Sequence, residues 1–190
     1  RNDAAADIFI RKDKGPWKGK DRFIQRDLSK TLKRIAKHGR DGFYTGPVAK
    51  MIVEEMKRGN GLISMDDLFN YSSKYREPVT GSYKGYEVIS MGPPSSGGAL
   101  LINMLNMLEL YEKDSLEWNS SDYVHILTEI ERRAYADRAE HMGDPDYWDV
   151  PLEMFKSKEY AKIRTADIDI NKASPSDEVY AGGPAGYESP

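Results

Sequence analysis

The feature that most constrains the fold is a pair of strand-like runs, residues 78–83 and 86–91, in a chain whose other patterns are mostly helical. In both runs the period shifts toward two, and Lys84-Gly85 between them suits a tight hairpin turn. A single hairpin is only marginally stable in water. We therefore predict an α+β fold, mostly helical, whose β-hairpin near residues 76–91 belongs to a larger sheet that this sequence contains only in part.

Helical spacing of apolar residues describes most of the remaining chain. The first predicted helix starts near Ile24 and stops at Gly39. A short helix after Ser64 carries the Ser-x-x-Asp pattern of a capping box. The longest helix is expected from Ser120 or Ser121 to Gly143. Other helices are expected over residues 47–57 (with a buried stripe of Val48, Met51, Ile52 and Met56), over 98–111, and as one or two short helices within 151–163.

Composition indicates a soluble globular protein with a real core. Of the 190 residues, 31% are charged and 39% hydrophobic, and the net charge is −3 with both signs interleaved. This pattern argues against a nucleic-acid or membrane surface, and no apolar run approaches the ~20 residues of a membrane span. The absence of cysteine excludes disulfides and thiolate chemistry in these residues. With no initiator Met and no signal-peptide pattern, we expect an interior piece of a longer protein.

The most distinctive loop is "MGPPSSGG", residues 91–98, between the second strand and the next helix. Its Ser and Gly amides at a helix start can cradle an anion, which makes Ser95, Ser96, Gly97 and Gly98 candidate pocket-wall residues. Neither serine lies in a Gly-x-Ser-x-Gly motif or has a base nearby in sequence, so a nucleophile is disfavoured. A structural role, a stiff turn with Ser96 capping the helix, is the preferred interpretation.

Two other charged stretches offer possible metal ligands, and both are better explained without a metal. Residues 131–146 place Arg133 and Asp137 four apart on a helix, which predicts an ion pair, whereas His141 lacks enough convergent ligands beside it. Residues 167–178 partly match a calcium loop, but Lys172 replaces the glycine that its sharp turn requires. We predict no metal and no cofactor.

Several stretches together resemble the gamma-glutamyltransferase family, also called gamma-glutamyl transpeptidases. The similarity runs in order from about Ile8 to the end, with "PPSSGG", "YADR" and "GDPD" as its most specific parts. One departure is Gly92, where the family usually has a third proline. The matching stretches are "DLSKTLKRIAKHGRDGFYTGPVAKMI", "GNGLISMDDLFNYSSKYREPVTGSYKGYEVISMGPPSSGG", "LLINMLNMLELY", "RRAYADRAEHMGDPDYWDVP" and "YESP".

The resemblance implies a fold and a maturation step. Family members are N-terminal-nucleophile hydrolases with a four-layer αββα sandwich, and each precursor cuts itself into a large and a small subunit. The 190 residues resemble the C-terminal part of the large subunit, one part of a composite domain. The Ser/Pro/Gly-rich residues 171–190 then read as a flexible tail, with Ser189 and Pro190 next to the cleavage site.

The resemblance also implies a function, γ-glutamyl transfer from glutathione and similar amides to an amino acid, a peptide or water. The catalytic Thr is expected just after Pro190, at the start of the small subunit, so no catalytic residue is predicted in this chain. Two alternatives remain open, an acylase or transferase for cephalosporins or poly-γ-glutamate on the same fold, and a scaffold without a nucleophile. Expected partners are the small subunit, γ-glutamyl compounds and acceptors, and the expected location is periplasmic, secreted or cell-surface.

Overall fold

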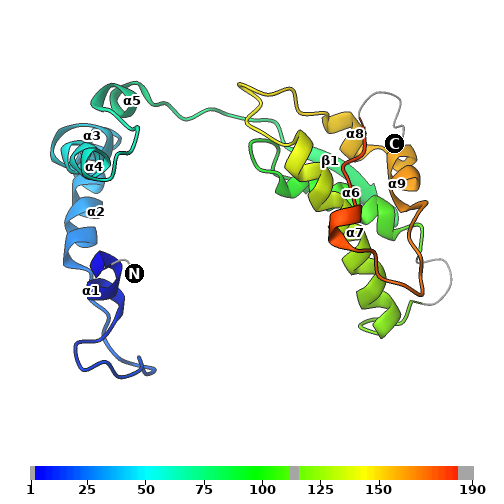
Figure 1. The fold of residues 1–190 in the computed structure, drawn as a ribbon. Helices are drawn as coiled ribbons and strands as arrows, with labels where there is room; N and C mark the ends of the chain where they lie inside the picture. Colours follow the sequence, from blue (N-terminus) through cyan, green and yellow to red (C-terminus); the bar gives the residue numbers. More distant parts are fainter. Residues whose placement is uncertain (1–2, 112–115, 184–190) are drawn as a thin grey trace. The chain divides into compact units, whose positions relative to one another are not determined.

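The computed structural model describes residues 3–111 and 116–183, and it divides into two compact units that join at Lys74 and Tyr75 (Figure 1). Each unit is described by itself. The first is helical and the second contains the hairpin. Among the described residues, no helix combines the length and the apolar character that crossing a membrane requires.

The first unit contains short and medium helices around a small core of Ala49, Val53 and Leu68. The capping box is confirmed, because Ser64 Oγ accepts from the Asp67 backbone N–H while the Asp67 carboxylate accepts from the Ser64 backbone. The helices are α1 (Asp3–Phe9), α2 (Arg26–His38), α3 (Asp41–Tyr44), α4 (Gly46–Arg58) and α5 (Met65–Asn70).

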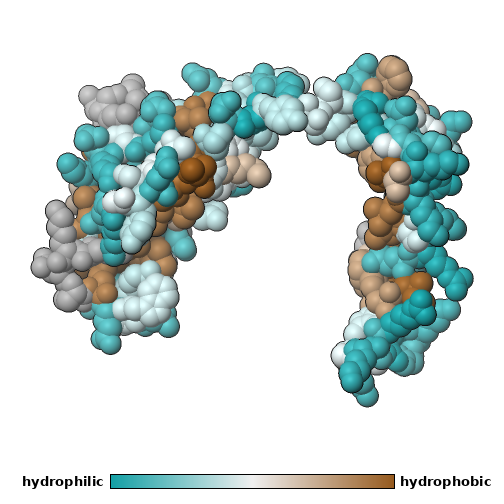
Figure 2. All heavy atoms as spheres, turned by 180° about the vertical axis from the view of Figure 1, so that it is seen from behind, coloured by the Kyte–Doolittle hydropathy of each residue, from teal (hydrophilic) through white to brown (hydrophobic). Residues whose placement is uncertain are grey.

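The predicted helix end at Gly39 is confirmed, since Gly39 follows α2 with a positive φ of 59°. In α4 the predicted buried stripe is partly wrong, because Met51 is exposed while Val48, Ala49 and Val53 are buried. Helix α2 also leaves Leu28 and Leu32 about half exposed. Figure 2 shows apolar surface along the helical unit.

The second unit starts with the predicted hairpin, β1 (Val79–Tyr83) paired antiparallel with β2 (Tyr86–Ser90). Lys84 and Gly85 both have positive φ, 49° and 81°, as a type I′ turn requires. One face of the hairpin packs on helix α6. The opposite face carries the pair Thr80 and Ile89, and Ile89 is 63% exposed.

Behind the hairpin, α6 (Gly97–Leu108) is the central helix of the unit. Its buried apolar side chains meet those of α7 (Ser121–His141), α8 (Leu152–Lys156) and α9 (Lys158–Thr165) in one core (Figure 1). Ser120 caps α7 through a hydrogen bond from the Tyr123 N–H at 3.1 Å, as predicted. After α9, residues 166–183 turn back along α7 and include a 3₁₀ helix, η2 (Ser176–Glu178).

Candidate functional site

The loop that carries the predicted pocket-wall residues is shaped by a close approach of two backbones. A Cβ at Gly98 would lie 2.3 Å from the Met91 carbonyl oxygen, so only glycine fits where β2 ends beside the start of α6. Gly98 is buried, and Ser95 and Ser96 are half-buried. The loop is thus a tight connection between strand and helix, in line with the preferred interpretation.

The two serines of this loop are hydrogen-bonded within the unit. Ser96 Oγ accepts from Arg138 Nε at 3.0 Å, and Ser95 Oγ accepts from the Gly97 N–H at 3.3 Å. The predicted cap by Ser96 is therefore wrong: Ser96 occupies the N-cap position, but its hydroxyl points to α7 instead of the helix amides. Contact of residues 95–98 with a substrate stays a prediction.

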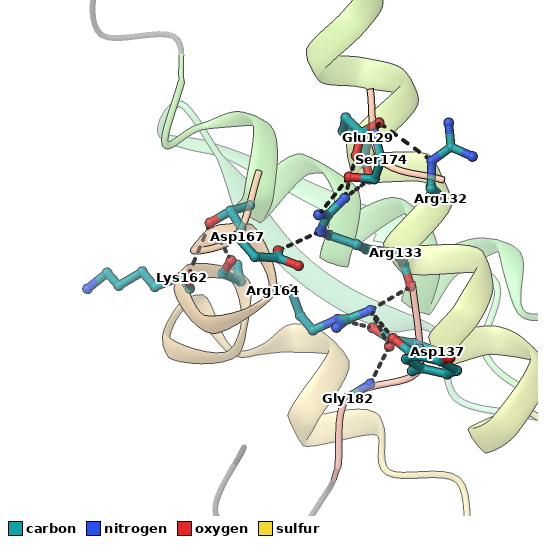
Figure 3. A network of polar contacts seen from close by, with 12 residues as sticks. Glu129, Arg132, Arg133, Asp137, Lys162, Arg164, Asp167, Ser174 and Gly182 are labelled. Carbon is teal, nitrogen blue, oxygen red and sulfur yellow. Dashed lines mark hydrogen bonds and ion pairs between the residues drawn. The ribbon is translucent and has the colours of Figure 1, made fainter. Parts of the chain in front are cut away.

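A second set of functional candidates lies on the buried face of α7. Glu129, Arg133 and Asp137 follow one another at intervals of four, and each is at most 1% exposed (Figure 3). Burying charged groups is costly unless every charge is paired and hydrogen-bonded. Their partners come from α9 and from residues 167–182, so α7 is connected by charges to the C-terminal part of the chain.

The first cluster centres on Glu129. Arg133 Nη1 donates to its carboxylate at 2.7 Å, and the Ser174 N–H donates to its other oxygen at 2.9 Å. Burial by itself raises the pKa of Glu129, but the hydrogen bonds from Ser174 and Arg133 outweigh it and lower the pKa to about 2. Arg133 Nε also binds Asp167 at 2.9 Å. The Glu129 carboxylate is thus charged and fixes the backbone at Ser174.

The second cluster centres on Asp137. Arg164 forms an ion pair with it at 3.0 Å, and the Gly182 N–H donates to the same carboxylate at 2.8 Å. Arg164 Nη2 additionally donates to the Tyr180 carbonyl at 2.9 Å, and His141 Nε2 donates to the Gly182 carbonyl at 2.5 Å. Burial raises the pKa of Asp137, and the charge of Arg164 offsets this only in part.

These partners correct the predicted pairing on α7. Arg133 binds Glu129 and Asp167, whereas Asp137 binds Arg164, which comes 27 residues later in the chain. Asp167, the first position of the calcium-like stretch, is therefore part of an ion pair. On α7, Val124 is half exposed, and the buried residues are Ile126, Glu129, Ile130, Arg133, Ala134 and Asp137.

Part of the signal for this network is present in the sequence. Glu129, Arg133 and Asp137 share a helix face with Ile126, Ile130 and Ala134 at steps of three and four. Charged residues on the same helix face as an apolar stripe indicate a buried face whose charges need polar partners from other segments of the chain. Those partners, Arg164 and the backbone at 174–182, could not be located from sequence spacing.

The predicted tail of residues 171–190 lies only partly within the described structure. Ser189 and Pro190, the predicted neighbours of the cleavage site, are outside the described residues. Residues 171–183 are described, and their backbone at Ser174, Tyr180 and Gly182 is hydrogen-bonded to side chains of α7 and α9. The flexibility of the tail stays a prediction.

Chemically, this arrangement can position chain segments. Within residues 3–111 and 116–183 there is no group of three or more His, Asp or Glu side chains placed to hold a metal ion. The carboxylates of Glu129 and Asp137 face guanidinium groups and backbone amides. Such a network orders the backbone and leaves nucleophilic chemistry to other residues.

Comparisons with known proteins extend over nearly the whole chain. The sequence model described as gamma-glutamyltranspeptidase matches residues 1–189. A glutathione hydrolase proenzyme of Escherichia coli (strain K12) is 44% identical over 178 residues, 94% of this chain and 31% of that protein. An acylase ACY 1 proenzyme of Pseudomonas sp. (strain SE83) is 41% identical over 85% of this chain and 29% of that protein.

A solved structure of similar fold is the gamma-glutamyltranspeptidase of Helicobacter pylori. It aligns with a TM-score of 0.79 and 41% identity, covering 94% of this chain and 51% of that one. The prediction of an α+β segment from an N-terminal-nucleophile hydrolase sandwich is thereby confirmed. The chain spans about a third of the length of the curated relatives that it matches.

Proposed function

Because the chain belongs to the gamma-glutamyltranspeptidase family, we propose that the protein of which it is a part transfers or hydrolyses the γ-glutamyl group of glutathione and related amides. The observation that carries this proposal is the match of the family model to residues 1–189, together with 44% identity to a glutathione hydrolase proenzyme. In this proposal the 190 residues are a supporting part of the enzyme.

The proposed reaction is a two-step acyl transfer. A Thr hydroxyl, expected just after Pro190, attacks the γ-glutamyl carbonyl, and the amine of the donor leaves with a proton. The resulting ester is then attacked by an amino acid, a peptide or water, which releases the product and restores the hydroxyl. The described residues support a nucleophile outside this chain, because Ser95 and Ser96 are hydrogen-bonded to Gly97 and Arg138 and have no base as a partner.

A second candidate is supported by one observation, the 41% identity to an acylase proenzyme. In this alternative the complete protein would use the same Thr ester on a different amide, such as an acylated cephalosporin. The residues that separate the two substrate classes are expected in the small subunit. Rates on both kinds of amide, measured with one preparation, therefore distinguish the two candidates.

Maturation and location form part of the same proposal. The relatives are named proenzymes, which supports a precursor that is cut into this part and a small subunit. We infer a periplasmic, secreted or cell-surface location from the family, with γ-glutamyl compounds and amino-acid or peptide acceptors as small-molecule partners. Fractionation of cells that express the complete precursor tests the location.

The test of the function uses the complete precursor. We expect two bands on a denaturing gel after purification, and release of 4-nitroaniline from its γ-glutamyl derivative that rises when a dipeptide acceptor is added. Replacing the predicted Thr by Ala should leave one band and no release. An uncut wild-type precursor without activity would favour the scaffold alternative, and activity on glutaryl-cephalosporin alone would favour the acylase.

A further inference from the structure

The backbone of residues 171–183 is attached to the body of its unit at two places, here called the Ser174 anchor and the Gly182 anchor, and between them Arg132 of α7 binds the Ser176 hydroxyl. The Ser174 anchor is the bond from the Ser174 N–H to Glu129, at 2.9 Å. The Gly182 anchor consists of Asp137, Arg164 and His141, which bind the backbone of residues 180–182 at 2.8, 2.9 and 2.5 Å. Figure 3 shows Asp137 and Arg164 beside Gly182.

Both anchors act on the main chain of the segment. Most of residues 171–183 are exposed, and Gly182 is the buried residue among them. Apolar burial therefore holds the segment weakly, and charge-assisted hydrogen bonds to backbone groups provide most of the attachment. Asp137 is fully buried and Arg164 is 6% exposed, so the pair is itself fixed by the core around it. Because this buried, rigid pair binds backbone atoms, it fixes the path of the segment independently of the side chains that the segment carries.

We propose that Asp137, Arg164 and His141 are positioning residues for the self-cleavage of the precursor. They hold the backbone at residues 180–182, and this directs the following residues to the junction expected after Pro190. The inference rests on the proposed function, which requires that cleavage. In the cleavage the peptide C–N bond breaks and one water is consumed, which leaves a carboxylate on this chain and a free amine on the Thr.

Chain length gives the expected size of the effect. Gly182 lies eight positions before Pro190, and Ser176, whose hydroxyl is bound by Arg132, lies 14 positions before it. Without the Gly182 anchor, Ser176 is the nearest described attachment before the junction, so the connecting length nearly doubles. The entropy of bringing a chain end to a fixed point makes each doubling cost roughly threefold in local concentration. We therefore expect cleavage to slow by at least about twofold when the Gly182 anchor is lost.

The first test changes the segment and leaves α7 and α9 intact. In Gly182→Ala the new Cβ would lie 2.4 Å from Tyr160 Oη and 3.0 Å from Arg164 Cδ, so the segment must move off the anchor. The control is Asp177→Asn, a change at an exposed side chain of the same segment. The complete precursor is made in each form, and the fraction cleaved is followed on denaturing gels. Slowing of at least about twofold in Gly182→Ala, with wild-type cleavage in Asp177→Asn, supports the proposal.

The second test changes His141 on α7 and asks whether a conservative replacement restores cleavage. His141→Ala removes the donor to the Gly182 carbonyl, and His141→Gln supplies an amide N–H that can reach the same carbonyl. We expect slower cleavage in His141→Ala and recovery in His141→Gln, with the melting temperature of the uncleaved precursor unchanged in both. Because His141 is only partly buried, this pair stays informative even if Gly182→Ala does not fold.

The outcomes separate the two proposals. A wild-type precursor that never cleaves contradicts the proposed function. A wild-type precursor that cleaves, with Gly182→Ala and His141→Ala cleaving at the same rate, overturns the positioning role alone. Equal slowing in His141→Ala and His141→Gln also overturns it, because a general disturbance of the site would explain both.

Discussion

At the scale of single residues, Glu129 is a buried charge whose hydrogen bonds hold another segment of the chain in place. Its carboxylate is 1% exposed, yet it is bound by a guanidinium on one oxygen and a backbone amide on the other. Removing a partner from such a pair leaves an uncompensated charge, which usually costs more than the intact pair contributes. The same carboxylate also fixes the backbone at Ser174, so its charge state governs the attachment of the C-terminal segment.

Glu129 predicts a specific dependence of stability on pH. Its pKa of about 2 lies below the ordinary 4.5, so its contribution is complete above about pH 4.5 and is lost as the pH falls toward 2. The shift corresponds to at most about 3 kcal/mol. We expect Glu129→Gln to lower the free energy of unfolding by about 1–3 kcal/mol at pH 6, with the loss shrinking between pH 4.5 and 2.5. Urea unfolding at a series of pH values measures this.

The control for this prediction is Glu153→Gln, at a carboxylate that is 86% exposed and paired with Lys156 on the surface. Surface pairs contribute little, so a small loss at every pH is expected there. A loss for Glu129→Gln that stays constant from pH 6 to 2.5 would contradict the assignment of a depressed pKa.

At the scale of elements, the junction between β2 and α6 depends on one glycine. The ideal Cβ at Gly98 would lie 2.3 Å from the Met91 carbonyl oxygen, whereas at Gly97 the nearest atom would be Ser95 Oγ at 3.4 Å. The Cβ at Gly98 would force the backbone to move, whereas the Cβ at Gly97 would make an ordinary van der Waals contact. We expect Gly98→Ala to cost at least about 2 kcal/mol and Gly97→Ala to change stability by less than about 1 kcal/mol. Thermal unfolding of the two variants side by side measures the difference, and equal losses would show that the close approach is unimportant.

The elements also show what sequence can and cannot predict. The hairpin and the α5 capping box were predicted because their signals are local, namely Lys84-Gly85 in one case and Ser64 with Asp67 in the other. The direction of the Ser96 hydroxyl was not predicted. Its partner, Arg138, lies 42 residues away in the sequence and competes with the helix amides for the Ser96 hydroxyl. For the candidate site, residues 95–98 lie where β2 leads into α6, and their contact with a substrate stays a prediction. The Asp137 cluster was missed because its partners meet only in the folded unit.

At the scale of the whole molecule, each described unit leaves apolar surface exposed. This surface includes Ile89 in the hairpin, which is 63% exposed, and Met91 just after the hairpin, which is 70% exposed. In the first unit Leu28 and Leu32 of α2 are similarly exposed. The chain spans about a third of its curated relatives, and a two-stranded sheet is too small to be stable alone. We therefore expect the outer face of the hairpin to be covered in the complete protein.

This expectation gives a prediction for the complete protein. Ile89→Lys places a charge on the outer face of β2, and if that face is covered the lysine must be desolvated without a partner. We expect a loss of at least about 2 kcal/mol of stability, or failure to accumulate as folded protein. The control is Ile89→Val, which keeps the side chain apolar at the same position and for which a loss of about 0.5–1.5 kcal/mol is expected. Unfolding of both variants of the complete protein provides the comparison. An Ile89→Lys variant as stable as Ile89→Val would mean that the outer face is open to solvent.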